Sequence, residues 1–136
     1  MAQQNTIEYF LFASAGNATD FGDLISARGS GSGFLSDGIR GVLGGGQDAG
    51  GLTTIMDRIV MASTGNATDF GDLTLARHSI GTCSSNIRGV YSSGVTAGDP
   101  WKTDTMDYIT IATVGNATDF GNLAANKADN SGASGD

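Results

Sequence analysis

One string of seven residues, Gly-Asn-Ala-Thr-Asp-Phe-Gly, occurs three times in this chain and constrains its fold more than any other feature. The copies lie at 16–22, 65–71 and 115–121, so that they are 49 and 50 residues apart. A fixed period of this length is the sequence signature of repeat architectures. We therefore expect one kind of structural unit that is repeated along the chain.

Charged residues recur on both sides of the string. An acidic residue precedes each copy, and a basic residue stands eleven positions after each Asn. The acidic residues are Glu8, Asp57 and Asp107, and the basic residues are Arg28, Arg77 and Lys127. Because the guanidinium group suits bidentate binding of carboxylates, the pattern predicts a recurrent Arg–carboxylate brace between strands or repeats. The brace should be weaker where Lys replaces Arg.

The segments around the string have the composition of short β-strands. Residues 59–61 and 109–111 are rich in β-branched and large apolar side chains and are bounded by Gly and polar turn formers. The string begins as a turn, because Gly and Asn tolerate positive φ, and then enters a further strand. No apolar i, i+3, i+4 pattern persists for about ten residues. The sequence predicts an all-β chain.

The candidate core residues are the Phe and the Leu that follow the turn in each repeat. They are Phe21 and Leu24, Phe70 and Leu73, and Phe120 and Leu123. Because the three Phe residues have identical surroundings in the sequence, we expect them to occupy equivalent buried positions.

Four short strands in every ~50 residues correspond to one blade of a β-propeller. The order of the segments resembles the kelch-like blade, in which an Arg-containing segment precedes a strand with a Gly-rich end, such as 44–46, an acidic-Tyr strand and an aromatic turn. The string with its following Asp-Leu and Ala-Arg looks like repeats in virion structural proteins of tailed bacteriophages, above all of phages that infect marine cyanobacteria. This resemblance covers roughly residues 6–127.

The resemblance implies about 2.5 blades per chain: a half blade at 6–24 and blades at 25–73 and 74–123. They form a single all-β repeat domain over residues 1–127, and a polar, flexible tail is expected at 124–136. A closed propeller needs ~4–8 blades, and open sheets would leave unpaired edges. We therefore expect other chains to complete the fold, with a trimeric non-propeller β assembly as the alternative architecture.

Paired oxygen ligands recur in the string and the residue after it, at Asp20/Asp23, Asp69/Asp72 and Asp119/Asn122. A Ca²⁺ site needs about six to eight oxygens, which is more than each turn supplies. We interpret these side chains as braces of the turn, bound to nearby backbone groups, and we expect no metal or other cofactor.

Catalysis is not expected from this sequence. His78 and Cys83 fall in one strand region at an odd separation, which points their side chains to opposite faces. A Cys nucleophile also needs a base and an orienting third group, and none can be identified. We predict that the protein is not an enzyme.

Two aromatic residues are candidates for contact with a partner chain or a glycan. Trp101 lies in the segment 97–102, where the two inter-motif loops differ most, and Tyr91 ends the strand before it. An aromatic ring in such a loop can stack on a sugar or anchor another chain. Packing between subunits is the alternative interpretation.

Charge and hydropathy limit the partners. The chain has 7 basic and 14 acidic residues, a net charge of −7, which disfavours nucleic acid because counterion release needs clustered Lys and Arg. No apolar run approaches the ~20 residues of a membrane span, so membrane insertion is not expected. No basic targeting segment precedes residue 7, and synthesis in the host cytoplasm is expected.

The resemblance implies a non-enzymatic structural component of a phage particle, in a tail, fibre or surface decoration. Its partners would be copies of itself, other virion proteins and a host surface glycan, and its location would be the virion. The alternative is an oligomeric propeller lectin or protein-binding module.

Overall fold

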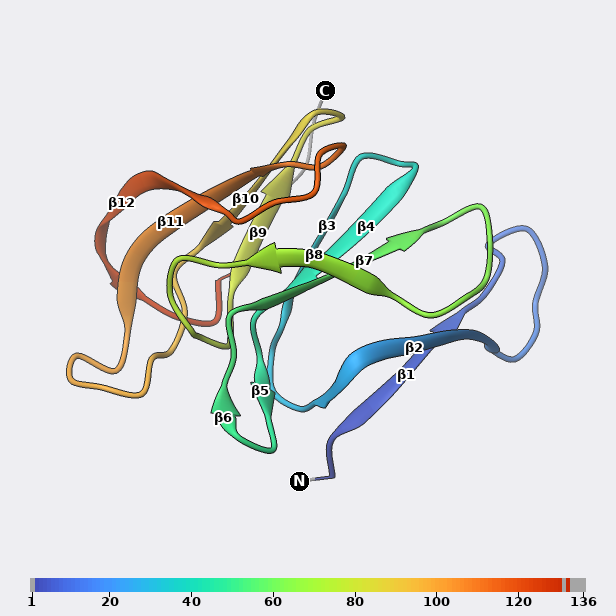
Figure 1. Cartoon of the computed structure of the whole chain (residues 1–136), viewed down its shortest axis with the longest axis horizontal. Coiled ribbons are helices and arrows are strands. Elements are labelled where there is room, and N and C mark those ends of the chain that lie inside the picture. The colour runs from blue at the N-terminus through green and yellow to red at the C-terminus, as the bar shows by residue number, and fades with distance from the viewer. Residues whose placement is uncertain (1, 131, 133–136) are drawn as a thin grey trace.

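The computed structural model describes residues 2–130 and 132 and shows an all-β chain of antiparallel strand pairs (Figure 1). The strands form two four-stranded sheets and two two-stranded sheets, none of which closes on itself. Over this part of the chain, no helix has the length and apolar character needed to cross a membrane. The prediction of an all-β fold is confirmed.

The N-terminal sheet is a hairpin of two strands, β1 (Gln4–Tyr9) and β2 (Thr19–Arg28). The loop between them contains the turn of the first string. The hairpin is longer than the expected half blade at 6–24, because β2 continues to Arg28, whose side chain is anchored in the next sheet.

The middle and the C-terminal sheets each contain four strands that follow the chain from one edge to the other. The middle sheet consists of β3 (Gly33–Ser36), β4 (Arg40–Gly44), β7 (Ile55–Val60) and β8 (Thr68–Asp72). The C-terminal sheet consists of β9 (Gly81–Ser84), β10 (Arg88–Ser92), β11 (Thr103–Thr110) and β12 (Thr118–Lys127). A small hairpin, β5 (Gln47–Asp48) and β6 (Gly51–Leu52), projects between β4 and β7.

The same β-bulge recurs in the N-terminal, the middle and the C-terminal sheets, at the Phe of the string. In the middle sheet, Met56 pairs with Gly71 and Asp57 pairs with Asp69, so that Phe70 is passed over. The hairpin and the C-terminal sheet pass over Phe21 and Phe120 in the same way. Because a bulge re-aims the side chain of its extra residue, it places each Phe at the same point of its sheet.

The main core lies between the middle and the C-terminal sheets, where β3 packs on β9 and β10. Leu35 fits over Gly89, since a side chain at residue 89 would collide with it. The buried apolar residues of this core are Leu35, Val42, Met56, Phe70, Leu73, Ile80, Tyr91, Ile109 and Ile111. The hairpin covers the opposite face of the middle sheet less completely and leaves a cavity of about 300 Å³ beside Leu24 and Phe34.

The flexible tail was expected to begin at residue 124, but the ordered part of the chain extends beyond that residue. Strand β12 runs through Lys127, the Asp129 N–H donates to Ser79 O at 3.1 Å, and the Asn130 side chain donates to Ser93 Oγ at 3.0 Å. Residues 124–130 therefore belong to the C-terminal sheet and its edge. Of the remainder, residues 131 and 133–136 lie outside the described residues.

Candidate functional site

The turn of the second string binds the strand of the first string. The Gly65 N–H donates to Phe21 O at 2.7 Å, and the Ala67 N–H donates to Asp23 O at 2.8 Å. In return, the Asp23 N–H donates to the Asn66 side-chain oxygen at 3.0 Å. These bonds join the hairpin to the middle sheet, and we call this set of contacts the joint.

The joint repeats between the middle and the C-terminal sheets. The Gly115 N–H donates to Phe70 O at 2.8 Å, and the Ala117 N–H donates to Asp72 O at 2.8 Å. The Asp72 N–H donates to the Asn116 side-chain oxygen at 3.1 Å. The second string therefore binds on two sides: its Phe strand accepts the third string, and its Gly-Asn-Ala turn binds the first.

The last Gly of the string is required by the closeness of the joint. Gly71 has φ +134, which side chains disfavour, and a Cβ there would lie 2.5 Å from Gly115 O. Gly22, with φ +147, would collide with Gly65 O in the same way. A side chain at either position would therefore push the two sheets apart.

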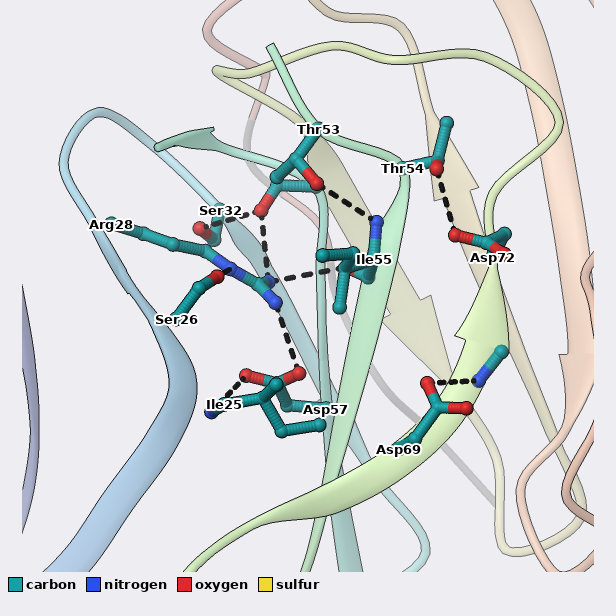
Figure 2. A network of polar contacts seen from close by, with 12 residues as sticks. Ile25, Ser26, Arg28, Ser32, Thr53, Thr54, Ile55, Asp57, Asp69 and Asp72 are labelled. Atoms are coloured by element: carbon teal, nitrogen blue, oxygen red, sulfur yellow. Dashed lines mark hydrogen bonds and ion pairs between the residues drawn. The ribbon is translucent and has the colours of Figure 1, made fainter. Parts of the chain in front are cut away.

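A buried ion pair crosses each joint. Arg28 binds Asp57 at 2.9 Å, and Arg77 binds Asp107 at 2.9 Å, with all four side chains nearly or completely inaccessible. Figure 2 shows the first pair, in which Arg28 also donates to Ile55 O at 3.1 Å. The predicted Arg–carboxylate brace exists, and it joins each Arg to the acidic residue of the following repeat.

Burial governs the electrostatics of these pairs. Burial raises the pKa of Asp57 above its usual value, although the Arg28 charge and the Ile25 N–H act in the opposite direction. Burial likewise lowers the pKa of Arg77, and the charge of Asp107 opposes this change. Removing one partner of such a pair leaves an uncompensated charge in the interior, so the pair locks the relative position of two sheets.

Two of the three Phe residues lie in the interior, as their shared context predicts. Phe21 and Phe70 are buried, as is Leu73, while Leu24 and Leu123 are half-buried. Phe120 is 49% exposed, so the prediction of an equivalent buried position is wrong for this residue. The reason is its place in the array: the following string covers Phe21 and Phe70, and no sheet in the described part of the chain follows β12.

Tyr91 does not form a contact site for a partner or a glycan. It is fully buried, and its hydroxyl donates to Val42 O at 3.0 Å. Its ring fits against Gly44, where a Cβ would lie 2.9 Å from the ring carbons. Strand alternation places Tyr91 on the face of β10 that packs on the middle sheet, which corrects the prediction for this residue.

Trp101 is 70% exposed, as a contact residue should be. Its neighbours Pro100 and Lys102 line an open groove of about 680 Å³, whose other side is formed by the β5–β6 hairpin and by Leu75. Because Tyr91 is buried, the structure does not combine the two predicted aromatic residues into one surface.

The carboxylates of the strings bind backbone groups, as we expected of turn braces. Asp20, Asp69 and Asp119 each accept the N–H of the Gly two residues later, at 3.1–3.2 Å. Asp72 also accepts the Thr54 hydroxyl at 2.7 Å. Within the described ranges, no three His, Cys, Asp or Glu side chains gather in a way that could hold a metal ion.

From the sequence, the Asn of the string was expected to act only within its own turn. In the structure, Asn66 and Asn116 reach the preceding repeat and bind its backbone. The length of the identical string was a usable signal, because a turn alone does not require seven fixed residues.

No protein-family model matches the chain, and no curated protein resembles it significantly. The function is therefore inferred from the residues and their geometry together with the resemblance of the repeats.

Proposed function

We propose that this protein is a non-enzymatic structural component of a phage particle, in a tail, fibre or surface decoration, and that it acts through protein–protein assembly. The observation that carries the proposal is the repeated joint. The most strongly repeated residues of the chain, the string with its flanking acidic and basic residues, bind one sheet to the next.

The contacts of each joint hold two neighbouring sheets in a fixed relative position. Backbone hydrogen bonds, a buried ion pair and a close Gly contact act together across each junction. The carboxylates of Asp57 and Asp107 are occupied by these contacts. A protein built in this way is suited to hold its shape within a larger assembly.

We further propose that the sheets are kelch-like propeller blades, two complete and one half in each chain. The support is the four-stranded meander, its face-to-face packing on the next sheet and the period of the repeat. Other chains would complete the array. Electron microscopy of the assembly separates a closed ring of blades from a trimeric non-propeller β assembly.

Association with particles is the direct test of the virion role. Particles from a producing infection are banded on a density gradient, washed in high salt and analysed by quantitative mass spectrometry. We expect the protein at a fixed copy number per particle, like the known coat proteins in the same band. Recovery of the protein only in the soluble lysate would contradict the proposal.

A lectin is the second candidate, and the exposed Trp101 beside the groove of about 680 Å³ supports it. An aromatic ring next to such a groove can stack on a sugar ring. The isolated protein should then bind a defined glycan on an array, and Trp101→Ala should abolish that binding. Binding that is equal in both proteins would exclude Trp101 from the glycan site.

A further inference from the structure

At each end of the row of sheets, only one of the two surfaces that form a joint is present, and we call this a half-made joint. The two ends lie at opposite sides of the molecule (Figure 1). At the C-terminal end, Phe120 and Asn122 of β12 occupy the positions of Phe70 and Asp72, but no described residue binds their outer backbone groups. A Cβ on Gly121 would meet nothing within 4 Å, whereas one on Gly71 would strike the next string. The space for a following turn is therefore open.

The N-terminal end carries the matching surface. The turn of the first string, residues 16–18, is exposed, although its counterpart at 65–67 binds the preceding repeat. No hydrogen bond links the Asn17 side chain to another described residue, while Asn66 and Asn116 both bind across a joint. The first turn thus presents the donors and the acceptor that the end of β12 lacks.

The ion pairs leave a complementary pair of charges. Arg28 and Arg77 each bind the acidic residue of the following repeat, so the series ends with Lys127, which is exposed. The acidic counterpart in the first repeat is Glu8, which is also exposed and forms no ion pair with another described residue. The two unused charges have opposite sign and occupy the places of the two partners of the ion pair: Lys127 that of the Arg, and Glu8 that of the Asp.

Apolar residues at the two ends of the row of sheets are more exposed than their counterparts inside it. Ile109 and Ile111 of the third repeat are buried against the middle sheet. In the second repeat, the counterparts are Ile59, which is half-buried, and Met61, which is 39% exposed. In the first repeat they are Phe10 and Phe12, which are 62% and 97% exposed. At the opposite end, Phe120 is exposed, whereas Phe70 is buried at the equivalent position of the middle sheet.

We propose that these two ends bind each other between copies of this chain. The C-terminal face, formed by Phe120, Asn122 and Lys127, would accept the N-terminal surface of a second copy. That surface is formed by Glu8 of β1 and, in the loop after it, by Phe10, Phe12 and the turn at 16–18. The inference deepens the proposed function, and it rests on one part of it, namely that the protein acts by assembling. Because the two surfaces differ, the contact is heterologous and produces rings or filaments.

Charge reversal provides the test. In Glu8→Lys and in Lys127→Glu, the two charges at the contact have the same sign, so each purified variant should dissociate at least about tenfold more readily than the wild type. A mixture of the two variants, and the double variant, restore opposite charges at every contact. Sedimentation velocity at micromolar concentration should show assembly in the wild type, the mixture and the double variant.

An apolar pair of variants supplies the matched control. Phe12→Asp should abolish assembly, and it should not affect folding because Phe12 is 97% exposed and its ring packs on that of Phe10, which is exposed as well. Ile87→Asp should assemble normally, because its counterpart Ile39 stays exposed in the middle sheet, which already has a joint on both sides. Circular dichroism verifies that both variants are folded.

Three results would overturn the inference: a monomeric wild type, charge variants that sediment like the wild type, or a mixture that does not recover assembly. The proposed function fails separately. Assembly through this contact without any association with particles would refute the virion role and leave the contact standing.

Discussion

Breaking the buried ion pair between Arg77 and Asp107 should destabilise the protein strongly. The two groups are 2.9 Å apart, and neither side chain has accessible surface. In Arg77→Met, the Asp107 carboxylate keeps only the Thr74 N–H and hydroxyl as donors. An uncompensated buried charge of this kind costs about 3–5 kcal/mol, a large part of the ~5–15 kcal/mol that stabilises an average domain.

Urea denaturation at pH 7 and matched protein concentration measures this free energy of unfolding. Arg40→Met is the control, because Arg40 pairs with Asp37 at 2.8 Å while its side chain is 30% exposed. That pair should contribute at most about 1 kcal/mol. The double variant Arg77→Met/Asp107→Leu should lose less than the two single variants together, since it leaves no charge unpaired. Equal small losses in Arg77→Met and Arg40→Met would refute the reasoning.

Three further predictions concern the core, the pH dependence and metals. Phe70→Ala should lower the free energy of unfolding by about 3–5 kcal/mol, and Phe120→Ala by clearly less in an unassembled chain; equal losses by urea denaturation would show that both rings are buried. Burial raises the pKa of Asp57 in the folded chain above its ordinary 3.8. Protonated Asp57 therefore stabilises the folded chain below pH 3.8, and this contribution is lost as the pH rises through the pKa of the folded state. Stability should therefore fall more steeply with pH above 3.8 in the wild type than in Asp57→Asn, and parallel curves in a pH series of melts would contradict this. EDTA should leave the melting temperature unchanged, because Asp20 and Asp69 bind backbone N–H groups; a fall of several degrees that Ca²⁺ reverses would make them ligands.

The repeat made the architecture accessible from the sequence. The three identical strings and the β-branched segments around them predict all-β units of equal design, and the structure contains the strands in that order. The small β5–β6 hairpin was not predicted, because two-residue strands with Gly and polar residues leave no periodic pattern.

Burial at the ends of the array could not be predicted from a local pattern. Phe120 has the same neighbours in the sequence as Phe70, yet its exposure depends on whether another sheet follows in space. Tyr91 shows the reverse case: its ring is accommodated by Gly33 and Gly44 of a neighbouring sheet, more than forty residues away. Both outcomes depend on the order of sheets and not on the residue itself.

The sequence predicted a brace between an Arg and a carboxylate but did not show which acidic residue each Arg binds. Arg28 and Asp57 are separated by 29 residues, and Arg77 and Asp107 by 30. Each Arg therefore binds the acidic residue of the following repeat, which only the folded chain shows.

Hydrogen exchange of individual backbone amides, measured by NMR at low and high protein concentration, tests the central claim most directly. The claim is that each Gly-Asn-Ala turn binds the strand of the preceding string. The amides of Gly65 and Ala67 donate across the joint, so they should be protected at every concentration. Those of Gly16 and Ala18 should become protected only as the chains assemble. Exchange of Gly65 and Ala67 at the rate of a free loop would contradict the account.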